Sequence, residues 1–242
     1  MFIDKVNALK NSIAQINQEI RDTIITNESD LIVITDGVFD PDRYCKSKFK
    51  ILWILKEPYD QIDDGKPWGG GWDLPENILK KSLPIDFLKI KNTFWPMIYS
   101  TYSILNNFPS WDDMPDIEDD ISIIEVFKSS GYINVKKLPG HTRSNEQEID
   151  EYYNRYQKIL HKQLNIMNPD IIIGGNVLPL FFDYFKIDKQ NLNKKASCGY
   201  LMKDNKIYID AYHPAQTQVK RDIYCNDIIS AIKECINLKA DD

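Results

Sequence analysis

Short apolar runs separated by segments with helical periodicity constrain the fold of this chain most strongly. The clearest run is Phe-Lys-Ile-Leu-Trp-Ile-Leu at residues 49–55. A nearly continuous apolar run of this length is typical of a strand that is covered on both faces, as in a parallel sheet. Further runs that predict buried strands lie at residues 131–133, 170–173 and 207–211.

Helical patterns occupy the intervening segments. Apolar side chains recur at three- and four-residue steps over the first twenty residues, which predicts an amphipathic helix. Other segments with helical patterns are residues 90–105, 149–167, 177–185 and 223–236. We therefore predict one domain over residues 1–242, an α/β fold in the form of a three-layer α/β/α sandwich. Its central sheet is expected to be mostly parallel, with an N-terminal helical extension over about residues 1–30.

Capping and turn residues place the boundaries of these elements. Ser144 followed by Gln147 predicts the start of one helix, and Pro96 is expected in the first turn of another. Residues 203–206 predict a hairpin. The stretch from Tyr59 to Trp72 is rich in Gly, Asp and Pro, so we expect an irregular loop that either approaches a ligand closely or anchors two tryptophans.

Three polar motifs directly follow three of the predicted strands. They are Lys-Glu-Pro-Tyr at residues 56–59, Asn-Val-Lys-Lys at 134–137 and Tyr-His-Pro at 212–214. In an open α/β sheet the loops that leave the carboxyl ends of the strands converge on one crevice, where ligands bind. The sequence therefore predicts that Glu57, Asn134 and His213 meet in one pocket.

Composition limits the classes of function. With 242 residues, 43% of them hydrophobic and 27% charged, the chain is predicted to be an ordinary globular protein. No apolar run approaches the ~20 residues that span a bilayer, and the N-terminus lacks the apolar segment of a signal peptide, so we expect a cytoplasmic protein with no membrane partner.

The charge distribution also bears on nucleic-acid binding. A formal charge of −6 argues against a strongly electrostatic grip on duplex DNA. A local patch can still bind phosphate, and one is expected beside Asn134. Its members are Lys136, Lys137, His141 and Arg143.

The cysteines and the motif inventory give no sign of a cofactor. Cys45, Cys198, Cys225 and Cys235 include no C-x-x-C pair, so free thiols are expected. The sequence contains no H-E-x-x-H motif, no zinc-type cysteine and histidine spacing, no phosphate-binding P-loop and no nucleophile elbow. We therefore expect no metal and no cofactor.

The order of the three motifs resembles the uracil-DNA glycosylase superfamily, whose members carry an acidic residue with Pro-Tyr after a strand, then an Asn-bearing strand end, then a late His-Pro loop. Residues 132–140, followed by Arg143, a helix and the Asn168-Pro169 strand entry, are similar to the thermophile-type members. The resemblance covers about residues 49–236. Some members hold an iron–sulfur cluster on four thiolates, but the cysteine placement here does not match that arrangement.

This resemblance implies hydrolysis of the N-glycosidic bond of uracil or another deaminated base in DNA, single-stranded or flipped from a duplex. Glu57 would position water and face the sugar cation, and His213 would hydrogen-bond the departing base. Asn134 would read the base edge, Tyr59 would form a wall of the pocket and Phe94 would stack on the base. The phosphate-binding residues would be Lys136, Arg143, Lys220 and Arg221.

Plainer interpretations remain open for each role. Glu57 would then be a capped strand end, Asn134 a partner of buried backbone groups, and Tyr59 and Phe94 core residues. Glu57 replaces the Asp that is more usual in the resembled family, and Lys56 stands where many relatives carry a neutral amide. These departures favour a second function, a non-catalytic member of the fold that binds nucleic acid or modified bases. A third alternative is an enzyme that acts on free nucleosides.

Overall fold

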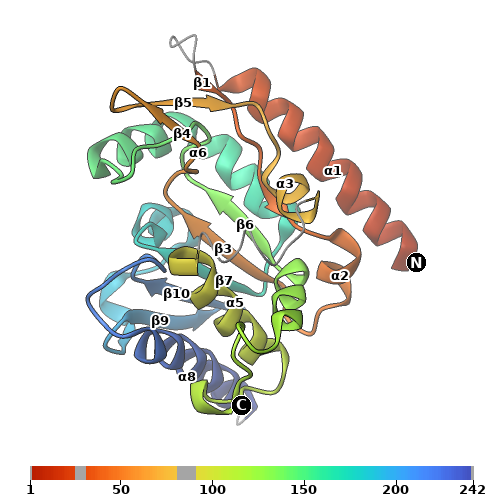
Figure 1. The fold of residues 1–242 in the computed structure, drawn as a ribbon. Coiled ribbons are helices and arrows are strands. Elements are labelled where there is room, and N and C mark those ends of the chain that lie inside the picture. The colour runs from red at the N-terminus through yellow and green to blue at the C-terminus, as the bar shows by residue number, and fades with distance from the viewer. Residues whose placement is uncertain (1, 25–30, 81–90, 241–242) are drawn as a thin grey trace.

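The computed structural model describes residues 2–24, 31–80 and 91–240, and a seven-stranded sheet forms its centre (Figure 1). The strand order is β2-β6-β3-β7-β10-β9-β8. The strands are β2 (Gly37–Val38), β3 (Ile51–Leu55), β6 (Gly131–Asn134), β7 (Ile171–Gly175), β8 (Asn193–Lys194), β9 (Cys198–Lys203) and β10 (Lys206–Ala211). The four central strands β6, β3, β7 and β10 are parallel, and the outer strands pair antiparallel.

The central strands confirm the four predicted apolar runs. Every residue of β3 is buried. Trp53 belongs to one hydrophobic cluster, whereas its neighbours Leu52 and Ile54 belong to a second cluster. Successive side chains of a strand point to opposite faces, so this strand is covered on both sides, as its sequence predicts.

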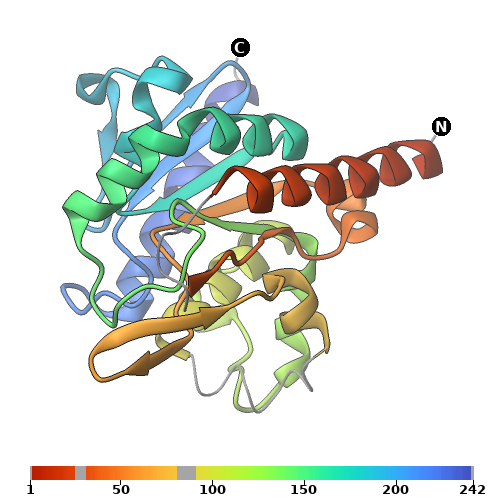
Figure 2. The same ribbon diagram turned by 90° about the horizontal axis from the view of Figure 1, so that it is seen from above.

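Helices surround the sheet (Figure 2). The α-helices are α1 (Phe2–Thr23), α2 (Pro41–Lys46), α3 (Leu74–Lys80), α5 (Lys91–Leu105), α6 (Glu146–Met167), α7 (Phe182–Phe185) and α8 (Arg221–Ala240). Short 3-10 helices are η1 (Trp111–Asp113), η2 (Ile121–Ser129), η3 (Leu178–Phe181) and η4 (Lys189–Asn191). Residues of α5 and α8 join one cluster, and residues of α6 and α7 join the other. The protein is therefore a mixed α/β structure with a large sheet whose core strands are parallel.

The predicted N-terminal helix is present as α1. Its residues Ile16 and Ile20 are buried in a third cluster together with Ile159 of α6. The helix therefore packs against α6. The expected boundary of an N-terminal extension, near residue 30, falls on residues 25–30, which lie outside the described residues.

A second, small sheet corrects the expectation that residues 59–72 form an irregular loop. Strands β4 (Gln61–Asp63) and β5 (Lys66–Gly70) make an antiparallel hairpin, and β1 (Leu31–Ile32) pairs parallel to β5. The turn residues Asp64 and Gly65 have φ angles of 45° and 75°. Two residues of positive φ match the twist of a tight hairpin, and Asp-Gly is the usual sequence for it.

Three helix boundaries also differ from the sequence prediction. The N-cap of α6 is Asn145 rather than Ser144, and its side chain accepts hydrogen bonds from the backbone of Gln147 and Glu148. Pro96 lies inside α5 rather than in its first turn. The helix expected over residues 177–185 is divided into η3 and α7. Within the three described segments, no helix is long and apolar enough to cross a membrane.

Candidate active site at the carboxyl ends of the central strands

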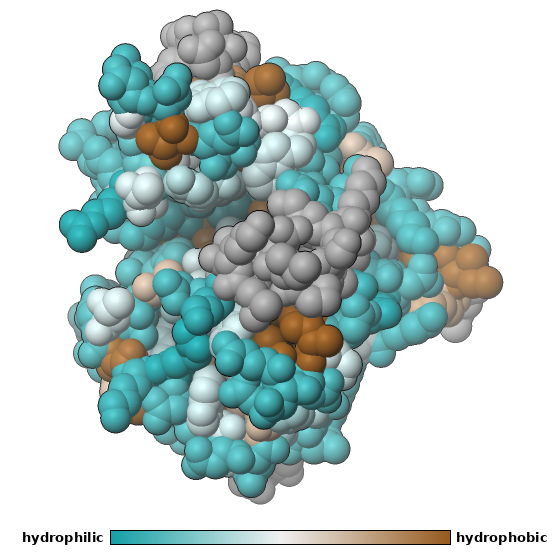
Figure 3. All heavy atoms as spheres, viewed as in Figure 1, coloured by the Kyte–Doolittle hydropathy of each residue, from teal (hydrophilic) through white to brown (hydrophobic). Residues whose placement is uncertain are grey.

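The predicted residues lie at one edge of the sheet. Glu57 follows β3, Asn134 ends β6 and pairs with Leu55, and His213 follows β10. The chain passes from β3 to β6 on one side and then to β7 on the other side of β3, which creates a topological switch point. Ligands of open α/β sheets bind outside the carboxyl ends of the strands at such a point. The surface is hollowed below the β4–β5 hairpin in Figure 3.

Glu57 is an enclosed acid at this edge. Its side chain is 3% exposed, and Oε2 lies 3.1 Å from Nζ of Lys136. A Cβ added to Gly140 would lie 2.0 Å from Cδ of Glu57, so only the bare backbone fits against this carboxyl group. The other oxygen, Oε1, is buried and has no hydrogen-bond partner among the described residues. Half of the Glu57 carboxylate is therefore without a partner within the described residues.

Lys136 does not have the phosphate-binding role expected from the sequence. Its side chain is 4% exposed, and Nζ lies between Oε2 of Glu57 and Oε1 of Glu148, at 3.1 and 2.5 Å. The ammonium is thus enclosed by two carboxylates and cannot face a DNA backbone. Lys56 makes a similar ion pair with Glu146. The first turn of α6 therefore supplies a carboxylate to the lysine that follows each of two neighbouring strands.

The side chain of Asn134 bonds one neighbouring side chain. Its Oδ1 accepts a hydrogen bond from the Tyr132 hydroxyl at 2.9 Å, and its backbone N–H donates to Oδ2 of Asp36 at 2.8 Å. The residue is fully buried, and Nδ2 has no partner within the described part of the chain. The amide does not bond buried backbone groups, so the plainer interpretation of Asn134 is wrong. An amide N–H donor is available instead.

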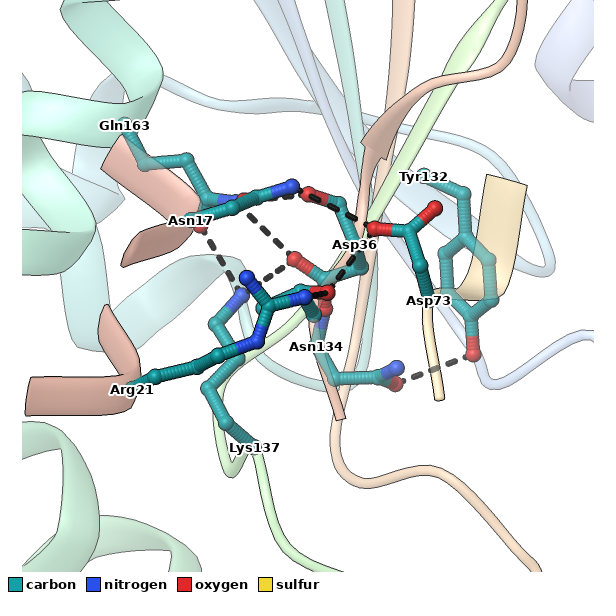
Figure 4. Close-up of polar contacts among 9 residues, drawn as sticks. Asn17, Arg21, Asp36, Asp73, Tyr132, Asn134, Lys137 and Gln163 are labelled. Atoms are coloured by element: carbon teal, nitrogen blue, oxygen red, sulfur yellow. Dashed lines mark hydrogen bonds and ion pairs between the residues drawn. The ribbon is translucent and has the colours of Figure 1, made fainter. Parts of the chain in front are cut away.

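A buried ion pair that the sequence analysis missed supports this strand end (Figure 4). Nζ of Lys137 lies 2.6 Å from Oδ1 of Asp36, and their side chains are 0% and 1% exposed. Gln163 of α6 accepts from Lys137 at 2.9 Å and donates to Asp36 at 2.9 Å. Lys137 therefore does not contribute to the basic patch expected beside Asn134. Burial lowers the pKa of Lys137, and the Asp36 carboxylate opposes this shift.

His213 is a neutral imidazole with a defined tautomer. Its Nδ1 accepts a hydrogen bond from the backbone N–H of Ala215 at 3.2 Å. Because a backbone N–H can only donate, the proton of the neutral ring resides on Nε2. Burial lowers the pKa of His213 to about 4, and the positive charge of Lys56 acts in the same direction. At neutral pH the ring therefore offers Nε2–H as a donor.

The two predicted aromatic residues have different environments. Tyr59 is 60% exposed, so its alternative as a core residue is wrong. Phe94 is 8% exposed and belongs to the core, with its ring edge-to-face to Phe127 and Tyr132 at centroid distances of 5.7 and 5.9 Å. We therefore correct the expected stacking role of Phe94, because its ring packs against other core rings.

The remaining predicted phosphate contacts lie near the surface. Arg143 is exposed in the segment before α6, and Lys220 is exposed immediately before α8. The guanidinium of Arg221 lies 5.2 Å from the ring centroid of Trp95, a cation–π contact. Arg221 and Pro214 also line a cavity of about 280 Å³ beside His213.

The structure thus brings the three predicted polar residues to one edge but not into one enclosed cavity. A cavity of about 610 Å³ nearby is lined by Tyr59 and Trp72 and not by Glu57, Asn134 or His213. Within residues 2–24, 31–80 and 91–240, no group of three or more His, Cys, Asp or Glu side chains could hold a metal ion. Burial raises the pKa of the Cys198 and Cys225 thiols to about 12 and that of Cys235 to about 11. These thiols are therefore poor nucleophiles at neutral pH.

The comparisons with known proteins give no indication of function. No protein-family model matches the chain, and no curated protein matches it significantly.

Proposed function

We propose that this protein hydrolyses the N-glycosidic bond of uracil or another deaminated base in DNA, on a three-layer α/β/α sandwich of the uracil-DNA glycosylase type. One observation carries the proposal: a buried carboxylate oxygen of Glu57 and a buried amide nitrogen of Asn134 both lack partners at the switch point of the sheet. Buried polar atoms without partners are rare in folded proteins, because each costs about 1–3 kcal/mol. Each of these two atoms would be satisfied by a water or by a group of a ligand.

Glu57 would act on the sugar side of the reaction. Cleavage of an N-glycosidic bond develops positive charge on the sugar, and a carboxylate can stabilise that charge or hold the attacking water. The Lys136 ammonium donates a hydrogen bond to Oε2. Oε1 remains to accept a proton of the water or to face the sugar.

His213 would act on the base side. Negative charge accumulates on the departing base, and a donor directed at a base carbonyl stabilises it. A neutral imidazole with its proton on Nε2 is such a donor. The bond from Ala215 to Nδ1 fixes this tautomer, so the ring can donate without first acquiring a proton from solvent.

Asn134 would select the base. Its Oδ1 is occupied by the Tyr132 hydroxyl, which leaves Nδ2 as the free group. A free donor favours a base edge that presents a carbonyl and disfavours one that presents an amine. Deamination replaces the exocyclic amine of cytosine or adenine by a carbonyl. The orientation of this amide therefore supports a deaminated base as the substrate.

The DNA strand would be held by the exposed cations around this edge. Arg143 and Lys220 are exposed and available for phosphate, whereas Arg221 is half-buried beside Trp95 and Lys136 is enclosed by carboxylates. With few phosphate contacts and a formal charge of −6, we expect weak binding whose affinity falls only modestly with added salt. That favours single-stranded DNA or a base that already leaves the duplex easily.

The test is release of the base from oligonucleotides that contain uracil, hypoxanthine or a thymine mismatch, measured as abasic sites. We expect release from at least one of them and its loss in Glu57→Gln. Glu118→Gln is a matched control, because Glu118 is exposed on a loop. Folded wild-type protein that releases none of these bases would refute the proposal.

One observation favours a second candidate, a non-catalytic protein of the same fold that binds nucleic acid or modified bases. The Lys136 ammonium lies 3.1 Å from Glu57, where its charge opposes a sugar cation. In that case DNA binding without turnover is expected, and Glu57→Gln would leave the affinity unchanged. Equilibrium binding measured beside the release assay distinguishes the two functions.

A further inference from the structure

A second hollow adjoins the candidate site and takes no part in the proposed reaction. Its volume is about 610 Å³, within the range of small-ligand pockets. Arg21 of α1, the aromatic side chains of Tyr59 and Trp72, and Asn77 of α3 are among its lining residues. Tyr59 is only two residues from Glu57, so the hollow and the candidate site share the segment that leaves β3.

The aromatic wall of this hollow is fixed by hydrogen bonds. Nε1 of Trp72 donates to Oδ2 of Asp60 at 2.8 Å, and the backbone N–H of Gly70 donates to the same oxygen at 2.7 Å. Gly70 has a φ of 94°, and a Cβ there would lie 1.8 Å from the carbonyl oxygen of Ile32. The indole is therefore held in place before any ligand binds, which lowers the entropic cost of binding.

The polar side of the hollow is equally well ordered (Figure 4). Oδ2 of Asp73 accepts hydrogen bonds from the Thr35 hydroxyl at 2.8 Å and from Nδ2 of Asn17 at 3.3 Å. Nη2 of Arg21 donates to the same hydroxyl at 2.9 Å. Figure 4 shows Asn17 and Arg21 reaching from α1 toward Asp73. The guanidinium is thus positioned by one of its five N–H groups, and its remaining donors lie at the rim.

The lining groups define the chemistry of the ligand. Among the described lining residues, Asp60, Asp73 and Glu76 carry carboxylates and Arg21 carries the positive charge. An acidic lining disfavours phosphate and favours groups that donate hydrogen bonds. Aromatic side chains stack on flat rings, and nucleobases stack on them without regard to sequence. Cytosine, adenine and guanine carry an exocyclic amine that carboxylates can accept. Uracil and thymine lack that amine.

We infer that this hollow binds a nucleobase with an exocyclic amine. On the proposed function, which this part of the inference requires, the base belongs to the strand that carries the target. The hollow then selects a base that carries an amine, whereas the free amide N–H of Asn134 selects a base that carries a carbonyl at the corresponding position. The protein would therefore read a deaminated base next to an unmodified amino-bearing base of the same unpaired strand.

The inference is tested by fluorescence anisotropy with labelled oligo(dC) and oligo(dT) of equal length. Both lack uracil and carry the same phosphates. We expect the full-length protein to bind oligo(dC) about tenfold more tightly, the effect of one good base-edge contact. Asn77→Ala removes a lining amide oxygen that can accept the exocyclic amine, and Trp72→Leu removes the stacking surface, so each should abolish this preference. Trp68→Leu should preserve it, because Trp68 is 42% exposed on the same hairpin but does not line the hollow.

Equal affinity for the two oligonucleotides overturns the inference. So does a preference for oligo(dC) that survives Asn77→Ala and Trp72→Leu, provided that both variants unfold at the same urea concentration as the wild type. Competition with cytidine monophosphate shows whether the hollow binds a free nucleotide or a base within a strand. If cytidine monophosphate binds and the oligonucleotides do not, the statement that the base belongs to a DNA strand is overturned. Base release is measured in parallel. If no base is released but the preference for oligo(dC) is observed, the proposed hydrolysis is refuted and the inference about the hollow stands.

Discussion

Replacing Lys137 by methionine tests whether the buried ion pair beneath the site stabilises the fold. Nζ of Lys137 lies 2.6 Å from Oδ1 of Asp36, and neither side chain is more than 1% exposed. Asp36 also accepts the backbone N–H of Asn134 and an amide N–H of Gln163. Methionine preserves most of the side-chain length and is flexible enough to fill the space, so the substitution removes chiefly the charge.

The expected loss follows from the charge that remains. Removing one partner of a buried pair leaves the other buried and uncompensated, which typically costs about 3–5 kcal/mol of unfolding free energy. Asp36 retains two N–H donors, so we expect the lower end of this range, about 3 kcal/mol. A domain has about 5–15 kcal/mol in total. Lys137→Met should therefore fold but unfold at much lower urea concentration.

Urea unfolding followed by circular dichroism measures this loss, with Lys10→Met as the matched control. The Lys10–Asp42 pair has a similar N–O distance, 2.8 Å, but side chains that are 49% and 46% exposed, and exposed pairs contribute little. The double variant Asp36→Asn/Lys137→Met should be more stable than Lys137→Met, because the unpaired charge is gone. A Lys137→Met variant as stable as Lys10→Met would refute the reasoning.

Three further predictions concern the candidate site. The pKa of His213 is about 4 in the folded protein against an ordinary 6.5, so the unfolded chain binds more protons between these two pH values. The protein should therefore lose stability as the pH falls from 6.5 to 4, and the His213→Gln variant should lose less. Urea unfolding at each pH measures both losses. In Gly140→Ala the new Cβ would lie 2.0 Å from Cδ of Glu57, so base release should fall by about a hundredfold, since small displacements of reacting groups have effects of that order. Tyr132→Phe removes the donor to Oδ1 of Asn134, which should cost about 1 kcal/mol of stability in urea unfolding and reduce the discrimination between carbonyl and amino bases in the release assay.

Controls for these variants come from the same sheet. Gly199→Ala adds a Cβ whose nearest neighbour is the flexible end of Leu192 at 3.3 Å, so it should retain base release. Wild-type release in Gly140→Ala would contradict the close fit of Glu57. If His213→Gln loses as much stability at low pH as the wild type, His213 is not the buried neutral imidazole described above. If Tyr132→Phe leaves base selectivity unchanged, Tyr132 does not determine which group Asn134 presents to the base.

The parts of the fold that were predictable are those governed by local pattern. The central strands appear as apolar runs because both faces of each are buried, and α1 and α6 appear through their apolar stripes. Strands such as β2 and β8 span two residues each, too few for any periodicity. The β4–β5 hairpin was obscured by its content of Gly and Pro, although Asp64-Gly65 was a usable signal.

The site was predictable in position but less so in its electrostatics. Residues that follow parallel strands meet at one edge whatever their partners, which is why Glu57, Asn134 and His213 could be grouped. Lys136 and Lys137 were expected at the surface because lysine is rarely buried without a partner. Some of their partners lie far along the chain: Asp36 and Lys137 are 101 positions apart. Spacing in the sequence gives no sign of such a pairing.

Each of the three central side chains is bonded on one side, and that bond determines what the other side can do. Lys136 occupies one oxygen of Glu57 and leaves an acceptor, Tyr132 occupies the oxygen of Asn134 and leaves a donor, and the Ala215 N–H occupies Nδ1 of His213 and again leaves a donor. One acceptor and two donors match a reaction that separates a sugar cation from a base anion. On the proposed function, reversing any one of the three bonds would place a group of the wrong polarity beside a developing charge.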